Sequence, residues 1–116
     1  MDTVLSRQAE LTAQRVDAAA VGFDPATILS ILMQVLPLLV GCFTRNSDPA
    51  ETSARFRAYA TNHPAECRRR TARRIRAEAD EPMTREQSFA LADAVIAQAF
   101  EVEPEVAAEC CVYAVG

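Results

Sequence analysis

The chain has 116 residues, enough for one domain with a modest hydrophobic core, and half of these residues are apolar. Its formal net charge is −4 at pH 7, so the molecule as a whole is not shaped electrostatically for nucleic acid. Alanine is abundant and only 3 residues are glycine, a composition that favours helices. No segment alternates polar and apolar residues between Gly or Asn turns, as a strand would. We therefore predict one all-α domain over residues 1–116, a compact bundle of five to six short helices.

The first predicted helix runs from about Thr3 to Val21 and stops at Gly22, because glycine readily adopts the left-handed conformation that ends helices. Most later helices are predicted to begin at a proline that follows an acidic residue or a histidine. Proline is tolerated at the first helical position, and an acidic residue before it can accept a hydrogen bond from the free N–H groups of the first turn. These predicted starts are Asp24-Pro25, Asp48-Pro49, His63-Pro64 and one near Pro104. Another predicted helix begins at Thr84, where Gln87 completes a capping box.

Residues 25–44 form a run of twenty residues without a charge, and a helix so apolar must be hidden from water. We predict that a helix over about residues 25–43 lies at the centre of the bundle. Pro37 should kink this helix, because proline lacks the N–H that would bond the carbonyl one turn earlier. Small or polar residues recur along it at spacings of three and four, so this stripe either faces water or forms a packing seam against another helix or subunit. The small-residue stripe consists of Thr27, Ser30, Gln34, Pro37 and Gly41.

Three interpretations of the apolar run are open. It is a core helix, alone or shared between subunits, or a single membrane span, since twenty residues would cover ~30 Å. The third is a helix that a conformational change exposes for insertion into a membrane. A span is disfavoured by Gln34 near its middle, by charged residues directly at both ends, and by the lack of Trp or Tyr belts. The sequence therefore favours the core helix.

Residues 67–76 read CRRRTARRIR and hold six of the 12 basic residues. The chain contains no lysine, and arginine binds carboxylate and phosphate groups in a bidentate manner. One interpretation is a basic interaction face for an acidic protein partner or for nucleic acid, although no aromatic residue interrupts the arginines to stack on single strands. The residues of this face are Arg68, Arg69, Arg70, Arg73, Arg74 and Arg76.

The other interpretation of this segment, which the sequence favours, is a solvated helix face whose charges are neutralised by acids one turn away on the same helix. The expected pairs are Glu66–Arg70, Arg74–Glu78 and Arg76–Asp80.

The sequence indicates no catalytic or metal-binding site. His63 is the only histidine, and a capping or surface role is expected for it because it directly precedes a proline at a helix start. So few glycines leave no Gly-rich phosphate loop. The cysteines form no C-x-x-C pair and, together with His63, match no standard zinc spacing; they are Cys42, Cys67, Cys110 and Cys111. We expect no catalytic residue, metal, cofactor or small-molecule substrate.

The first residues contain no apolar segment typical of a secretory signal, so we expect an intracellular protein with free thiols, in the cytoplasm or within a virion or other large particle. The expected function is that of a small non-enzymatic structural or interaction protein, a homo-oligomer or a subunit of a larger assembly. One alternative is a regulatory protein that binds nucleic acid or an acidic protein through residues 67–76. A second alternative is a membrane-inserting protein that uses residues 25–44.

Overall fold

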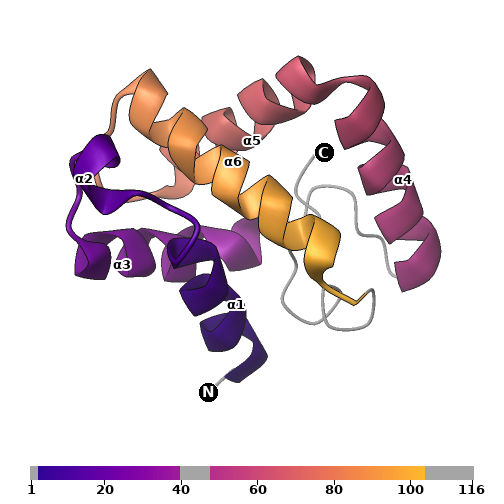
Figure 1. Ribbon diagram of the computed structural model, residues 1–116, viewed down its shortest axis with the longest axis horizontal. Coiled ribbons are helices and arrows are strands. Elements are labelled where there is room, and N and C mark those ends of the chain that lie inside the picture. The colour runs from indigo at the N-terminus through magenta and orange to yellow at the C-terminus, as the bar shows by residue number, and fades with distance from the viewer. Residues whose placement is uncertain (1–2, 40–47, 104–116) are drawn as a thin grey trace.

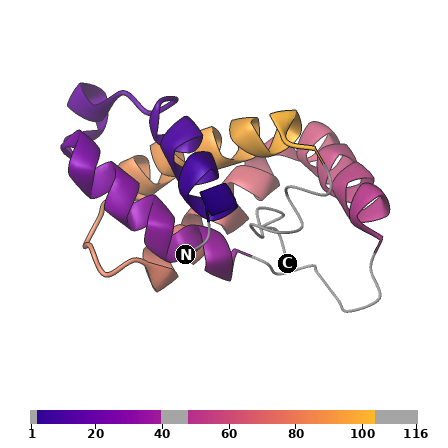
Figure 2. The same cartoon turned by 90° about the horizontal axis from the view of Figure 1, so that it is seen from below.

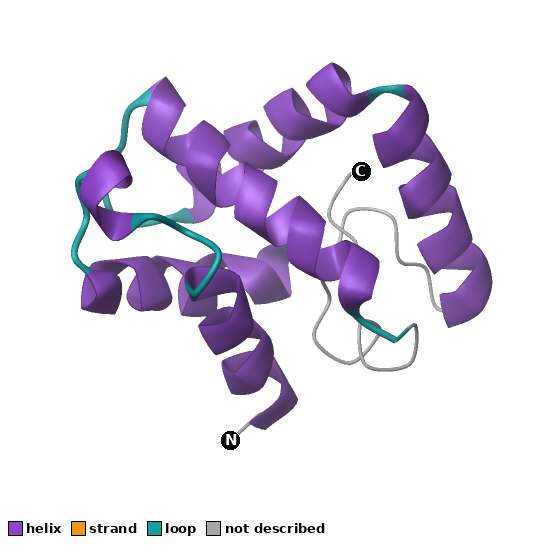
Figure 3. Cartoon of the chain, in the orientation of Figure 1, coloured by secondary structure: helices purple, strands orange, loops and turns teal. Residues whose placement is uncertain are grey.

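The computed structural model describes residues 3–39 and 48–103, which form α-helices and one 3-10 turn without any strand (Figure 1; Figure 3). The predicted all-α bundle is therefore confirmed. The elements are α1 (Thr3–Ala13), α2 (Ala18–Val21), α3 (Pro25–Val35), η1 (Leu36–Leu38), α4 (Pro49–Asn62), α5 (Pro64–Glu78) and α6 (Arg85–Glu101). The helix predicted to begin near Pro104 lies outside the described residues.

The amino-terminal part of the chain forms two helices, α1 and α2, so the prediction of one long helix up to residue 21 is wrong. Asp17 explains the break: its carboxylate accepts a hydrogen bond from the Ala20 N–H at 3.4 Å and caps α2. A short polar side chain of this kind offers the backbone an alternative to a continuous helix. The predicted stop at Gly22 is confirmed, because this residue has a φ of 85° in the left-handed region and donates its N–H to the Ala18 carbonyl.

The helix starts predicted at residues 24, 48, 63 and 84 are confirmed. Asp24 accepts a hydrogen bond from the Thr27 N–H at 2.8 Å, and Asp48 caps α4 in a similar way. At the start of α6 the capping box is complete. Thr84 Oγ1 accepts from the Gln87 N–H at 3.1 Å, and Gln87 Oε1 accepts from the Thr84 N–H at 2.8 Å.

The predicted interruption of the apolar helix at Pro37 is confirmed, since α3 ends at Val35 and the proline lies in the 3-10 turn that follows. The predicted continuation to residue 43 falls partly on residues 40–47, outside the described part of the chain. The segment supplies six of the largest fully buried side chains of the core, namely Ile28, Ile31, Leu32, Val35, Leu36 and Leu39. In residues 3–39 and 48–103, no helix combines the length and the apolarity needed to cross a membrane.

The helix α6 crosses the molecule and packs on α5 and α1, while α3 packs against α1 and α5 (Figure 1). Figure 2 shows the same arrangement from below, with α4 extending at one end, where it contacts α5. The core cluster that contains the apolar segment also includes side chains from four other helices, among them Ala9 on α1, Phe56 on α4, Ile75 on α5 and Leu91 on α6. The core therefore lies between α3 and the α5–α6 pair.

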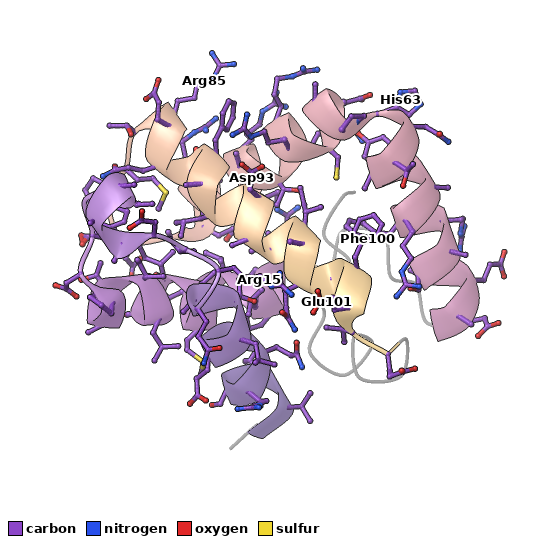
Figure 4. All side chains as sticks on the ribbon, in the orientation of Figure 1. Arg15, His63, Arg85, Asp93, Phe100 and Glu101 are labelled. Atoms are coloured by element: carbon purple, nitrogen blue, oxygen red, sulfur yellow. The ribbon has the colours of Figure 1, made fainter. Side chains whose placement is uncertain are left out.

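Buried polar side chains join α1 to α6. Gln98 Nε2 donates to Gln8 Oε1, and Gln98 Oε1 accepts from Arg15 Nε, both at 2.9 Å. Arg15 also forms an ion pair of 2.6 Å with Glu101, near the end of α6 (Figure 4). This short network fixes how α1 lies across α6.

Candidate interaction surface

The small-residue stripe lies on the side of α3 that faces away from the core. Ser30 and Pro37 are exposed and Thr27 and Gln34 are half-buried, while Gly41 lies outside the described residues. The stripe borders a hollow of about 400 Å³ between α3 and the loop that follows α5. Within the described chain the stripe is thus the water-facing side of α3.

Gln34 uses its amide within the chain. Its Nε2 donates to Asp80 Oδ2 at 2.8 Å, and its Oε1 accepts from the Asp80 N–H at 3.1 Å. The group best suited to a hydrogen bond across a subunit seam is therefore already paired with the α5–α6 loop. The seam between subunits stays a prediction.

The predicted basic face lies on α5, and two of its arginines are paired with acids. Arg70 pairs with Glu66 at 3.7 Å one turn away, as predicted. Arg68 pairs with Asp93 of α6 at 2.8 Å, a partner that the sequence analysis missed. Both ion pairs are about half exposed and contribute little to stability.

The other two local pairs predicted for this face do not form, so the prediction that its charges are neutralised on the same helix is wrong for them. Arg74 instead donates to the Leu38 carbonyl of η1, and Arg76 donates to Ser88 Oγ of α6 at 2.6 Å. The reason is tertiary: α5 packs against α6 and α3, and acceptors on α6 and on the η1 turn that follows α3 come within reach. The acids at 78 and 80 are left for other contacts or for water.

Arginines of α5, Arg76 again included, meet residues of α6 at a second hollow, of about 220 Å³. Three of them recur at intervals of four and three and so share one side of α5. Two residues one turn apart at the start of α6 complete the lining, because α6 returns beside α5 after a short loop. Arg85, at the first turn of α6, lies at the outer edge of the molecule (Figure 4). We call this hollow the arginine pocket, and its lining is Arg69, Arg73, Arg76, Arg85 and Phe89.

The electrostatics of the arginine pocket are unbalanced. None of its four guanidinium groups forms an ion pair with a carboxylate of residues 3–39 or 48–103. Two guanidinium groups lie over the Phe89 ring, Arg68 at 4.7 Å and Arg85 at 5.0 Å from the ring centroid. The potentials of these positive charges add up in the hollow, so the pocket attracts anions.

Arg85 and Phe89 were not predicted from the sequence as parts of a site. Phe89 belongs to the apolar spacing of the last described helix, so the pattern indicates a core residue. The signal that could have found them is topological: a short loop between two helices predicts antiparallel neighbours, which brings the start of α6 beside the end of α5.

Histidine and cysteine offer little reactive chemistry in the described chain. His63 is exposed at the junction of α4 and α5, with its ring centroid 5.7 Å from that of Tyr59. Cys67 is buried, and this burial raises the pKa of its thiol, which keeps it in the unreactive protonated form. Among the described residues, no three His, Cys, Asp or Glu side chains gather where they could hold a metal ion. Cys42, Cys110 and Cys111 lie outside these residues.

The fold and its surface define a small all-α protein with a cationic pocket between α5 and α6. Protein families, curated proteins and solved structures provide no match to this chain.

Proposed function

We propose that the protein is a small non-enzymatic interaction protein that binds an acidic segment of a partner protein through the arginine pocket. The observation that carries this proposal is one hollow lined by four arginines that have no carboxylate partner in the described chain. The positive charge is confined to this part of the surface, whereas the whole chain carries a net charge of −4. An acidic segment would be attracted to this one place on the surface.

The acids that lie near the pocket arginines in the sequence favour a short acidic segment over nucleic acid. Glu78 and Glu81 follow the arginines of α5, and Glu86 follows Arg85; all three are exposed. These carboxylates would repel the phosphate backbone of a duplex, which has to be contacted at several successive positions for strong binding. A protein segment that places only one or two acidic side chains in the pocket avoids most of this repulsion.

The test is binding of a fluorescein-labelled octaglutamate peptide, measured by fluorescence polarisation. The double variant Arg69→Gln/Arg73→Gln should bind at least about fivefold more weakly, because exposed ion pairs contribute up to ~1 kcal/mol each. The control is Arg7→Gln/Arg55→Gln, which removes the same charge from exposed positions on α1 and α4. An equal loss in both variants would mean non-specific attraction and would overturn the proposal.

Duplex DNA serves as the competing ligand in the same assay. We expect a random 20-base-pair duplex to bind more weakly than octaglutamate at the same salt concentration. Tighter binding of the duplex, lost in Arg69→Gln/Arg73→Gln and kept in the control, would replace the acidic protein partner by nucleic acid.

A further inference from the structure

We infer that the arginine pocket receives a phosphate monoester carried on a side chain of the partner protein, that is, a phosphoserine or phosphothreonine. This inference rests on the proposed function and specifies the group that fills the pocket. It starts from a mismatch between the pocket and a carboxylate. Four arginines line the hollow, whereas a carboxylate offers only two oxygens and one negative charge.

A phosphate monoester matches the pocket better in charge and in acceptors. It carries a charge of about −1.5 to −2 at pH 7 and three strong acceptor oxygens. Arginine binds such groups through two parallel N–H···O bonds, so several arginines can share one phosphate. One N–H of the Arg76 guanidinium already donates to Ser88. The guanidinium groups of Arg69, Arg73 and Arg85 therefore remain as the main donors to a phosphate.

Contacts within the chain hold two arginines of the pocket, Arg76 and Arg85, before any ligand binds. Ser88 orients Arg76 through the bond of 2.6 Å, and the Phe89 ring lies beneath the guanidinium of Arg85. Arg68, over the same ring, is itself held by Asp93. Arginines that are already oriented lose less conformational entropy on binding, which favours affinity.

The size and position of the pocket fit one phosphate group and not a chain of them. The hollow measures about 220 Å³ and is lined by one side of α5 and by the first turns of α6. The positive end of α6, a helix of 17 residues, adds to the potential of the arginines at this place. Phe89 supplies an apolar wall for the carbon atoms that carry the phosphate.

The experiment compares three labelled peptides that differ only at one central residue, which is phosphoserine, glutamate or serine between identical flanking residues. Binding to the full chain is measured by fluorescence polarisation. We expect the phosphoserine peptide to bind at least about tenfold more tightly than the glutamate peptide, the size of one additional charge-assisted hydrogen bond. The serine peptide should bind most weakly.

The variants Arg73→Lys and Arg73→Gln separate bidentate recognition from charge alone. Arg73→Lys keeps the positive charge but loses the planar guanidinium that donates two parallel hydrogen bonds. Most of the preference for phosphoserine over glutamate should therefore disappear. The matched control Arg55→Lys, on α4, should keep it. The ³¹P resonance of the phosphopeptide should shift on binding to the wild-type chain, and Arg73→Gln should remove this shift. Circular dichroism verifies that each variant is folded.

The failures of the two proposals are distinguishable. Equal binding of the phosphoserine and glutamate peptides would overturn the phosphate inference and leave the acidic partner in place. Binding of neither peptide would overturn both. A preference for phosphoserine that survives in Arg73→Gln would place the phosphate outside the arginine pocket and would also overturn the inference.

Discussion

Single buried side chains decide how α1 is held against α6. Gln98 is nearly fully buried and is bonded on both sides, to Gln8 and to Arg15. A buried amide of this kind adds little while it is paired, but the loss of one partner leaves the other unsatisfied. The energetic importance of the network therefore shows when it is broken.

We expect Gln98→Ala to lower the free energy of unfolding by about 1–3 kcal/mol, because the Gln8 amide then loses its partner away from water. Urea denaturation followed by circular dichroism measures the change. Gln14→Ala, at an exposed position in the turn after α1, is the control and should change stability little. A similar, small change in both variants would contradict the importance of the network.

Cys67 links stability to alkaline pH, since burial raises the pKa of its thiol above the ordinary value of 9.0. In the unfolded chain the thiol ionises first, so the unfolded state loses its proton earlier and gains stability as the pH rises. Stability that is fully present below about pH 8 should therefore fall as the pH rises through about 9. The chain has no lysine but contains three further cysteines and two tyrosines, so the contribution of Cys67 has to be isolated by substitution.

Cys67→Ala tests this assignment. Urea midpoints measured at about pH 7.5 and 9.5 should differ less in the variant than in the wild-type chain, because the buried thiol no longer contributes. The comparison is between two pH values for each protein, so a general loss of stability in the variant does not affect it. The same pH dependence in both proteins would assign it to other groups.

At the scale of elements, the sequence predicts helix starts well and helix interruptions less well. A start depends on neighbours in the chain, such as the capping pair Thr84 and Gln87, and these act wherever the helix is placed. The break at Asp17 depends on a weak preference of one residue, which an otherwise helical pattern conceals. Pro37 is predictable because it removes a backbone donor regardless of context.

The partners of the arginines could not be predicted from local spacing. The i,i+4 rule finds Glu66 for Arg70, but Arg74 and Arg76 turn to η1 and α6, and Arg68 turns to Asp93. An exposed pair on one helix is worth only ~0.2–0.5 kcal/mol, so any well-placed acceptor on a neighbouring element can replace it. The arginine pocket follows from these tertiary choices.

Gln34 on α3 and the α5–α6 loop form the contact that best tests the small-residue stripe. We expect Gln34→Leu to lower the free energy of unfolding by about 1 kcal/mol, because the two bonds to Asp80 are lost at a partly exposed site. Thermal unfolding measures this loss, and Ser30→Ala, on the same stripe, is the control. The molar mass from light scattering should stay unchanged in both variants. A lower mass in Gln34→Leu alone would show that the amide joins subunits.

At the scale of the whole molecule, charge is separated over a short distance. The net charge is −4, yet the arginine pocket gathers four cations on one side of the α5–α6 pair. Such a local field steers an acidic partner toward one orientation and weakens as salt is added.

The prediction of a homo-oligomer or a subunit of a larger assembly belongs to this scale. Size-exclusion chromatography with light scattering, at two protein and two salt concentrations, should show a mass that rises with protein concentration. Leu38 and Phe100 are large apolar side chains that remain exposed, at 45% and 37%, and contacts between copies would cover them. A strict monomer at high protein concentration would contradict the assembly.

Gln87 serves two elements at once. Its Oε1 caps the first turn of α6, and its Nε2 donates to the Val21 carbonyl at the end of α2, at 2.9 Å. The amino-terminal third of the chain and the helix end that carries Arg85 are therefore joined through one amide. Opening of α1 and α2 would remove the bond from Gln87 to Val21 and loosen the start of α6, so the affinity of this pocket depends on the whole fold. A peptide that contains only residues 64–101 would carry every arginine of the pocket without the support that holds Arg85 in position.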